Sequence, residues 1–356
     1  MPLDRLIVWS ALGMQIPLGI ASVGVFSPGG ITVGQTLGSF LAGMRPFQEI
    51  DVDDPAGEPL VAAATALEPE RLRGTERLIA MAMAALLDCT EGAADPDGAS
   101  ARVPEPLLLC GPDAQCTDAV LSALLHDMPL RLDESRSRAF VGGHCTILAA
   151  LEEALRLVSS GEIETCYVGG VDSLLDGERL QMLIGDRRVK HSAHQDGFVP
   201  GEGAAFLRVV SHVDARAAVV IPGLATGQES ATRDSGLPNN GQGLFSAARA
   251  ALKAAGLSIK SVELLSFDGS GDRFGAQEAN RALVRLRPRR EQQLQIWQIA
   301  GALGELGTAH GPASLALLAF AIARSVLPVT RGLALWSSDG AQRAAALVAR
   351  NPRHQA

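Results

Sequence analysis

Short apolar runs alternate with amphipathic helical patterns along most of the chain. A short apolar run between turn residues is typical of a buried strand, and apolar residues at i, i+3 and i+4 indicate a helix facing a core. We expect strands at 18–26, 107–111, 165–171, 204–210, 217–225, 262–269 and 332–338. We expect helices at 72–90, 117–128, 146–161, 244–256, 275–286 and 310–326. This alternation predicts an α/β fold of βαβ units around a mostly parallel sheet.

The segment 146–158 shows the helical pattern most clearly, because its apolar and charged positions fall on opposite faces. Its predicted buried residues are Ile147, Leu148, Leu151, Leu155 and Val158, and its predicted exposed residues are Glu152, Glu153 and Arg156. The same order of strand, Gly-rich turn and long helix recurs after residues 211–217. We therefore expect two halves, 1–214 and 215–356, with polar loops at 91–106, 185–203 and 226–243.

The N-terminal region contains no charged residue from Leu6 to Gly43. The apolar stretch 6–26 has the length of a membrane span. However, Gln15, Pro17 and three glycines interrupt it, and it lacks the basic start and small-residue cleavage site of a signal peptide. We expect a buried strand at 18–26 that turns at 27–30, and no membrane partner.

Composition narrows the function classes further. The chain has 356 residues, 47% of them hydrophobic, which suits a large core. The net charge of −8 argues against a nucleic-acid partner. The five cysteines show no metal-ligand spacing, and their odd number predicts a reducing cytoplasm. The Gly-rich stretch 227–243 lacks a nucleotide-binding motif, so we expect no nucleotide.

The sequence VGGHC at 141–145 places a cysteine directly before a predicted helix. Backbone N–H groups and the helix dipole favour a thiolate at such a position. Cys145 is therefore a candidate nucleophile, with His144 beside it.

Six segments then occur in an order that resembles the β-ketoacyl synthase family of the thiolase superfamily. They are SGE at 160–162, VGGVDS at 168–173, QDGFVPGEGAAFL at 195–207, DGSGDRFGAQE at 268–278, GALGELGTAHGPASLA at 301–316 and WSSDGAQRAAALV at 336–348. The third closely resembles the family's RDGFVxGEGAG segment. The resemblance implies the five-layered α-β-α-β-α thiolase fold, with two pseudo-related halves, and a homodimer.

The resemblance also assigns the family's catalytic positions. Counting back from SGE and GGV places the nucleophile position, in the turn 141–146, at His144 and leaves Cys145 one residue later. Adjacent helical residues differ by about 100° in direction, so Cys145 is expected to point away from the site. The two family histidines map to Asp268 and Glu305. The upstream lysine maps to Ala300 and the gating aromatic to Ser338. His310 follows Glu305 by five residues and is expected to be a poor substitute.

Decarboxylating condensation needs a thiolate together with donors or cations at the developing enolate oxygen. Carboxylates at Asp268 and Glu305 have the wrong charge for that role. We therefore predict a catalytically degenerate protein with no firm catalytic residue, no cofactor and no metal. Three readings of His144, Asp268 and Glu305 stay open: an internal hydrogen-bonded ion pair, a divalent-metal site, and a new acid–base pair.

The predicted function is that of a cytoplasmic ketosynthase-like pseudoenzyme, acting as a non-catalytic partner, accessory or chaperone-type protein. Its expected partners are a second copy and a partner protein or acyl carrier. The pattern of 169–180 followed by 197–205 resembles thiolase-like proteins that accompany type VI secretion effector clusters. One alternative is an acyltransferase or condensing enzyme using Cys145. Another is an acyl-chain binding protein, whose tunnel would pass Phe198 and Ser338.

Two further clusters have weaker claims. His191 and His194 lie in a predicted loop, where solvated histidines are common, although they are candidate ligands. The stretch 281–293 carries five arginines that could meet a phosphate or an acidic carrier protein. A solvated surface is the favoured interpretation of this stretch.

Overall fold

The structure is a computed structural model that describes residues 17–67, 72–91, 103–214, 216–269, 271–286 and 294–354. Within these ranges, ten strands form one sheet in the order β10-β9-β11-β12-β8-β1-β7-β6-β4-β5. Their bounds are β1 (Leu18–Phe26), β4 (Leu107–Gly111), β5 (Arg138–Val141), β6 (Thr165–Ser173), β7 (Glu202–Ser211), β8 (Val219–Gln228), β9 (Leu264–Phe267), β10 (Gln295–Trp297), β11 (Arg331–Ser337) and β12 (Gln342–Arg350).

The strand order consists of one five-stranded pattern used twice. In the first half β1, β7 and β6 pair antiparallel, and β6, β4 and β5 pair parallel. In the second half β8, β12 and β11 pair antiparallel, and β11, β9 and β10 pair parallel. Within the described sheet, the two halves pair where Leu18–Ile20 of β1 lie beside Val219–Ile221 of β8.

The prediction of a mostly parallel sheet is therefore wrong, because the described sheet is mixed. Parallel pairing is confined to strands joined through helices. A strand that returns through a short turn must run antiparallel, as β12 does after β11. Our proposed boundary between the halves falls between β7 and β8, and Ala215 itself lies outside the described residues.

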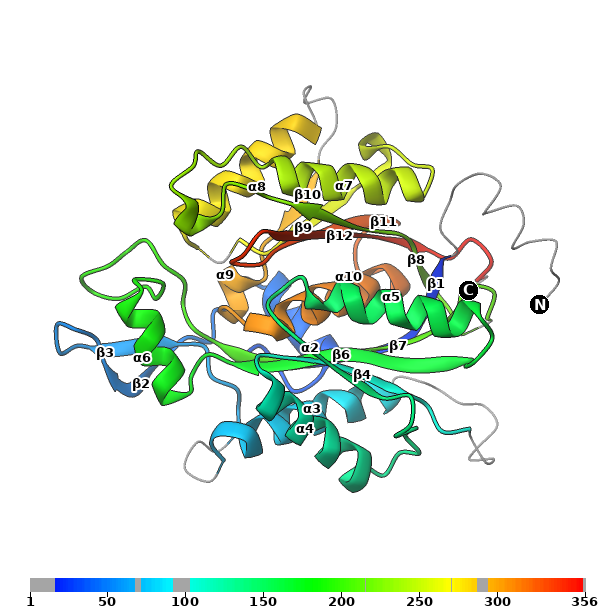
Figure 1. Ribbon diagram of the computed structural model, residues 1–356, viewed down its shortest axis with the longest axis horizontal. Coiled ribbons are helices and arrows are strands. Elements are labelled where there is room, and N and C mark those ends of the chain that lie inside the picture. The colour runs from blue at the N-terminus through cyan, green and yellow to red at the C-terminus, as the bar shows by residue number, and fades with distance from the viewer. Residues whose placement is uncertain are drawn as a thin grey trace.

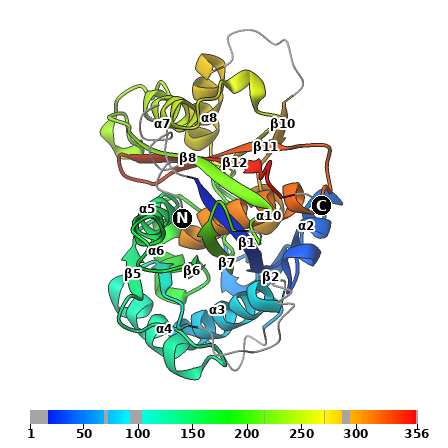
Figure 2. The same cartoon turned by 90° about the vertical axis from the view of Figure 1, so that its right-hand side faces the viewer.

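Helices cover both outer faces and fill the space between the two parts of the sheet, giving the predicted five layers (Figure 1). The outer helices are α3 (Gly74–Glu91) and α4 (Ala114–Asp127) on one side and α7 (Gln242–Ala254) and α8 (Arg273–Leu286) on the other. The central layer contains α2 (Val33–Leu41), α5 (Thr146–Ser159) and α10 (His310–Ala323). Figure 2 shows α5 and α10 between the two parts of the sheet.

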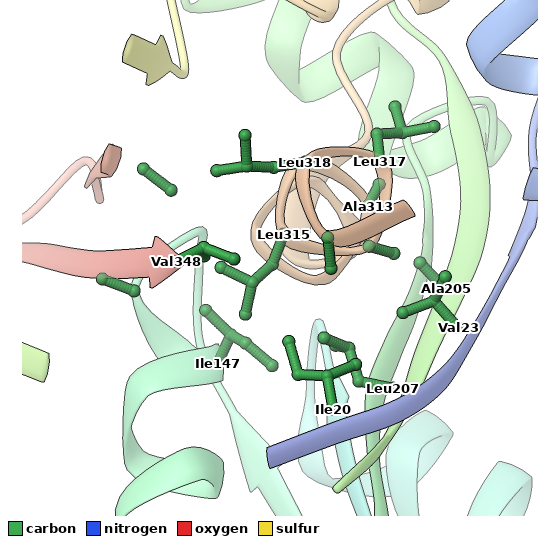
Figure 3. Close-up of a cluster of buried hydrophobic side chains, with 14 of the residues drawn as sticks. Ile20, Val23, Ile147, Ala205, Leu207, Ala313, Leu315, Leu317, Leu318 and Val348 are labelled. Carbon is green, nitrogen blue, oxygen red and sulfur yellow. The ribbon is translucent and has the colours of Figure 1, made fainter. Parts of the chain in front are cut away.

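The helix α10 is the centre of the main core, and all its residues from His310 to Ala319 are buried. Such a helix is apolar all round because it has packing partners on every side. In Figure 3, Leu315, Leu317 and Leu318 extend from it among side chains of α5 and of both parts of the sheet, labelled Ile147, Val348, Ile20, Val23, Ala205 and Leu207.

The helix α5 follows its predicted burial only near its start. Ile147, Leu148 and Leu151 are buried as expected. Leu155 and Val158 are only half-buried, and Leu157 is buried in their place. Glu152 and Arg156 are exposed, whereas Glu153 is partly covered and pairs with Arg156. The buried face of α5 therefore differs between its start and its end, because only the start is enclosed by other elements of the core.

Several elements were not predicted: α2, α6 (Gly177–Gly185), the short helix α9 (Ala300–Leu303), the hairpin of β2 (Gln48–Asp53) and β3 (Pro59–Ala62), and the edge strands β5 and β10. The strand at 18–26 and the turn at 27–30 are confirmed, since Ser27 and Gly30 exchange backbone hydrogen bonds. Among the described helices, none has the length and apolar character needed to cross a membrane. Residues 6–16 of the apolar stretch lie outside the described ranges.

The GEG segment at 201–203 contains a glutamate, Glu202, at the centre of a buried hydrogen-bond network. The Glu202 side chain is fully buried and accepts hydrogen bonds from Arg77, Thr65 and Ser173. Burial alone would raise the pKa of Glu202, but the Arg77 guanidinium and the Thr65 donors hold it below its usual value. Glu202 thus fixes the start of β7 from inside, and its role is structural.

Candidate functional site

The turn after β5 presents His144 at the start of α5. Gly142 has a φ of 157°, and a Cβ there would lie 2.4 Å from Thr146 Oγ1. Only glycine fits that position, so the chain can turn sharply from the strand into the helix. The His144 carbonyl then packs against Gly311 of α10, where a Cβ would lie 2.6 Å from the carbonyl oxygen. The turn is therefore held between two central helices.

His144 lies between two carboxylates. Its Nδ1 is 2.8 Å from Asp268 Oδ2, and its Nε2 is 2.7 Å from Glu305 Oε1. Because both ring nitrogens face acceptors, both must donate, and the ring is an imidazolium. Burial alone would lower the pKa of His144, but the Glu305 and Asp268 carboxylates hold it well above its usual value. We call these three residues the charged triad.

The two carboxylates of the charged triad are themselves fixed by the backbone. Asp268 follows β9, and its Oδ2 also accepts the Ser337 N–H at the end of β11. Glu305 follows α9, and its Oε1 also accepts the Gly307 N–H at 2.9 Å. The Glu305 backbone pairs with Val199 and Gly201 of the GFVPGEG segment. The structure thus brings together the three positions that motif spacing predicted.

Cys145 faces away from the charged triad, as register counting predicted. Its Sγ lies 3.3 Å from the Trp336 carbonyl oxygen and 3.4 Å from that of Gln342, so it faces the β11–β12 hairpin. Its backbone N–H donates to Ser338 Oγ at 3.2 Å. The residue is only 6% exposed, and burial raises the pKa of the thiol to about 11. At neutral pH Cys145 is a buried thiol.

His310 lies closer to His144 than its separation of five residues from Glu305 suggested, although it does not line the cavity. Its ring stacks on that of His144 with 4.9 Å between centroids and 23° between planes. The chain from Gly307 to Ala309 forms a 3-10 turn, so the first residue of α10 returns toward Glu305. His310 is fully buried, and neither ring nitrogen has a hydrogen-bond partner among the described residues. Burial and then the His144 charge lower its pKa well below the usual value.

A cavity of about 130 Å³ opens beside the charged triad, whose three side chains line it together with Phe198 and Ser338. Four arginines on its wall each form an ion pair, which are Arg179–Asp172, Arg188–Asp339, Arg233–Asp272 and Arg343–Glu278. The wall is therefore polar and charge-balanced. Its volume is well below the roughly 300–1,000 Å³ of common small-molecule pockets.

Residues 218–334 match the family model described as the C-terminal domain of β-ketoacyl synthases. The spectinabilin polyketide synthase system protein NorC of Streptomyces orinoci is 29% identical over 198 residues, which cover 51% of this chain and 9% of that protein. The chain thus spans under a tenth of this relative.

Two solved structures are similar over nearly the whole chain. One is a type II polyketide synthase acyl-carrier protein in complex with its ketosynthase bound to the hexaketide. It has a TM-score of 0.79 at 14% identity and covers 95% of this chain and 100% of that chain. The other is a ketosynthase in complex with its chain length factor from Xenorhabdus doucetiae. It has a TM-score of 0.73 at 13% identity and covers 94% and 98%. The chain is thus similar to β-ketoacyl synthases in sequence over residues 218–334 and to ketosynthases in fold over nearly its whole length.

This β-ketoacyl synthase-like protein has the predicted thiolase-like fold, since its strand order, layers and structural neighbours agree. Ala300, to which the sequence resemblance maps the family lysine, is a buried residue at the first turn of α9. Ser338, to which the resemblance maps the gating aromatic, lines the cavity and accepts a hydrogen bond from the Cys145 N–H. Of the mapped positions, His144, Asp268, Glu305 and Ser338 line the cavity, and Ala300 is not among its lining residues.

Three of the remaining candidate side chains of this β-ketoacyl synthase-like protein make hydrogen bonds to backbone carbonyl oxygens outside the charged triad. His191 and His194 pair across a short backbone bridge, and His194 Nε2 lies 2.9 Å from the Arg187 carbonyl oxygen. In the described part of the arginine-rich stretch, Arg281 and Arg285 donate to the Asn239 and Asn240 carbonyl oxygens. Residues 287–293 of that stretch lie outside the described residues.

Proposed function

We propose that this β-ketoacyl synthase-like protein is a pseudoenzyme that acts as a non-catalytic partner, accessory or chaperone-type protein. The observation that carries the proposal is the charged triad at the catalytic position. His144 stands where the nucleophile would be, and both its nitrogens are engaged by Asp268 and Glu305. No lone pair of the imidazolium remains for attack on a thioester.

The charges around His144 also oppose condensation. An enolate oxygen forms during decarboxylation and needs hydrogen-bond donors or cations. Asp268 and Glu305 present carboxylate oxygens there, and the four wall arginines are already paired with acids. In a partly buried site these carboxylates would repel a developing oxyanion. The triad therefore favours a structural role that ties the two halves of the fold together.

The two alternative functions find less support. A condensing enzyme using Cys145 would need the thiol to leave its contacts with Trp336 and Gln342 and reach the cavity. An acyl-chain binding protein would need a tunnel, whereas the cavity next to Phe198 and Ser338 holds only about 130 Å³. That volume suits a few water molecules or a very small ligand.

A partner role draws support from the edge of the sheet and from the neighbours. The two solved structures named above are a ketosynthase with an acyl-carrier protein and a ketosynthase with its chain length factor. In this chain β5 pairs with β4 on one side, and no described strand pairs with its other edge. A free edge is a template for strand pairing. We propose that a second copy pairs there. We also propose that the protein accompanies type VI secretion effectors, because the pattern of 169–180 and 197–205 resembles that of such accessory proteins.

Acyl loading tests the absence of catalysis. The full chain is incubated with an acyl-CoA and with an acyl-carrier thioester, and its intact mass is followed. We expect no acyl adduct. Iodoacetamide at neutral pH should label the partly exposed Cys116 and leave Cys145 unlabelled. The Cys116→Ser variant is the matched control. A stoichiometric adduct lost in Cys145→Ala would overturn the proposal in favour of the condensing enzyme.

Reinstating the family residues sharpens this test. The triple variant His144→Cys, Asp268→His and Glu305→His restores the mapped nucleophile and both histidines. If the triad alone abolishes loading, this variant should form an acyl adduct that the wild-type chain does not form. Failure of both chains to load, with the triple variant folded, would mean that Ala300, Ser338 or the small cavity also prevents catalysis.

Native mass spectrometry tests the second copy. We expect a dimer that Val141→Lys weakens, because Val141 is 50% exposed at the end of β5 and a lysine there opposes strand pairing. Val284→Lys is the matched control, since Val284 is 69% exposed on α8, an outer helix of the other half. A monomeric wild-type chain at micromolar concentration would remove this part of the proposal.

A further inference from the structure

We propose that His144, Glu305 and His310 form a binding site for one divalent transition-metal ion of the Zn²⁺ class. One ligand atom from each residue lies within 4.8 Å of the other two. Motif spacing pointed to Asp268 as the third ligand, and the geometry replaces it with His310. The inference goes beyond the proposed function, because a non-catalytic partner needs no metal.

The first observation behind this inference is a set of buried polar atoms without partners. Both ring nitrogens of His310, which is 0% exposed, have no hydrogen-bond partner among the described residues. The same holds for Glu305 Oε2. Buried polar groups normally have a partner, so an unpartnered His310 ring beside an unpartnered Glu305 oxygen indicates a ligand there. One ion would bind one of the two His310 nitrogens, and the other nitrogen would carry the ring proton.

The second observation is the chemistry of the donor set. Two imidazoles and one carboxylate are a common set for Zn²⁺, with a fourth position left for water or substrate. Asp268 then has the role of an outer partner, because its Oδ2 lies 2.8 Å from His144 Nδ1. An acceptor at Nδ1 keeps that nitrogen protonated and turns the Nε2 lone pair toward the metal.

The distances suit an exchange of a proton for the ion. The proton on His144 Nε2 leaves for solvent, and the lone pair it releases forms the metal–nitrogen bond. Two ligands of a tetrahedral Zn²⁺ lie about 3.3 Å apart, given bonds of about 2.0–2.1 Å. His310 Nδ1 is already 3.7 Å from Glu305 Oε1, while His144 Nε2 at 2.7 Å must move outward. Binding therefore requires the His144 side chain to rotate away from Glu305 while the three ligand atoms, now within 4.8 Å of one another, close around the ion.

The cavity gives the ion a route to the site. His144 and Glu305 line it, and the His144 side chain is 16% exposed. His310 lies behind them at the start of α10. The fourth ligand would therefore come from the cavity side, where about 130 Å³ leaves room for water or a small anion. Each of the four arginines on the cavity wall is paired with a carboxylate. They therefore repel an entering metal cation less than unpaired arginines would.

The test uses the full chain after dialysis against a chelator. Zn²⁺ is titrated by isothermal calorimetry, and Co²⁺ is titrated by visible absorption to report a tetrahedral site. We expect one ion per chain. Glu305→Gln and His310→Ala should each weaken binding at least about tenfold, and Asp268→Asn about 10–100-fold. Mg²⁺ should not bind, because it prefers oxygen ligands.

Two matched controls guard against adventitious binding. His126→Ala removes a histidine on the outer helix α4, and Cys116→Ser removes a partly exposed thiol. Neither should change the affinity or the Co²⁺ spectrum. Because His310 is buried, His310→Gln provides a second, polar variant if His310→Ala does not fold. A folded wild-type chain that binds no Zn²⁺, or that binds it equally after Glu305→Gln and His310→Gln, would overturn the inference.

The acyl-loading test and this one fail independently. An acyl adduct on Cys145 would overturn the proposed function and leave metal binding untouched. Absence of Zn²⁺ binding would remove the metal site and leave the pseudoenzyme proposal as it stands.

Discussion

Two helices of the central layer, α5 and α10, begin side by side, and each brings a histidine to the same place. His144 comes just before α5, and His310 is the first residue of α10, with 4.9 Å between the ring centroids. Their environments differ in one respect that matters. His144 contacts two carboxylates, and His310 has no hydrogen-bond partner among the described residues. Identical side chains thus have pKa values shifted in opposite directions.

This comparison shows which contacts decide the charge of a buried imidazole. The start of a helix carries the positive end of its dipole, which disfavours an imidazolium at either position. Asp268 and Glu305 outweigh that effect at His144 because both lie within hydrogen-bond distance. His310 lies 3.7 Å from Glu305 Oε1, and the adjacent positive ring opposes a second charge. Only one of the two neighbouring imidazole rings is therefore positively charged, and the carboxylates determine that it is His144.

The largest predicted effect comes from removing the charged ring. His144→Phe leaves Asp268 and Glu305 without their cation and should reduce the free energy of unfolding by about 3–5 kcal/mol. Urea denaturation of the metal-free chain measures this loss. The triple variant with Asp268→Asn and Glu305→Gln removes the stranded charges and should recover at least half of it. An unchanged midpoint in His144→Phe would show that the triad contributes no stability.

The residues of the triad were predictable from sequence because the motifs fix their register. The Gly-Gly turn before α5, the DGSGD segment after β9 and the GELG segment after α9 each place one residue at a set distance from a recognisable turn. His310 was missed because counting along a helix does not apply across the 3-10 turn at Gly307–Ala309. A Cβ at Gly307 would lie 2.0 Å from Asp172 Oδ2, and that glycine was the available signal.

The elements of the fold also divide into those that the hydrophobic pattern predicts and those that depend on tertiary packing. Long apolar elements such as β1 and α10 were found, because burial imposes their composition. The β2–β3 hairpin and α6 were missed, since they bury only one side of short, polar segments outside the five layers. The direction of strand pairing also escaped the sequence, because it depends on how each connection returns to the sheet.

The pH dependence of stability gives the second prediction. A group whose pKa is raised on folding stabilises fully below its unfolded pKa of about 6.5 and loses that contribution as pH rises through its folded pKa. The folded pKa of His144 is raised well above 6.5, so the loss falls on the alkaline side. The stability difference between the wild-type chain and the uncharged triple variant should therefore narrow from about pH 7 to about pH 10. A difference that widens over that range would contradict an imidazolium at His144.

The third prediction separates the two carboxylates. Asp268→Asn and Glu305→Gln preserve shape and remove one charge each, and each should cost about 1–3 kcal/mol in urea denaturation. Because both touch the same ring, their effects should not be additive, and the double variant reports the coupling. Ser266→Ala is a control on β9 near Asp268, since its hydroxyl has no hydrogen-bond partner among the described residues. Strict additivity would show that the carboxylates act separately.

The smallest predicted effect concerns the other ring. His310→Phe removes no hydrogen bond that the described residues make, so in metal-free protein it should change the unfolding free energy by less than about 1.5 kcal/mol. This change is made 4.9 Å from the ring of His144, where the same substitution is expected to cost several times more. A loss as large as that of His144→Phe would mean that His310 has a partner even without metal. With Zn²⁺ present the two outcomes separate further, because the wild-type chain should gain thermal stability and His310→Phe should not.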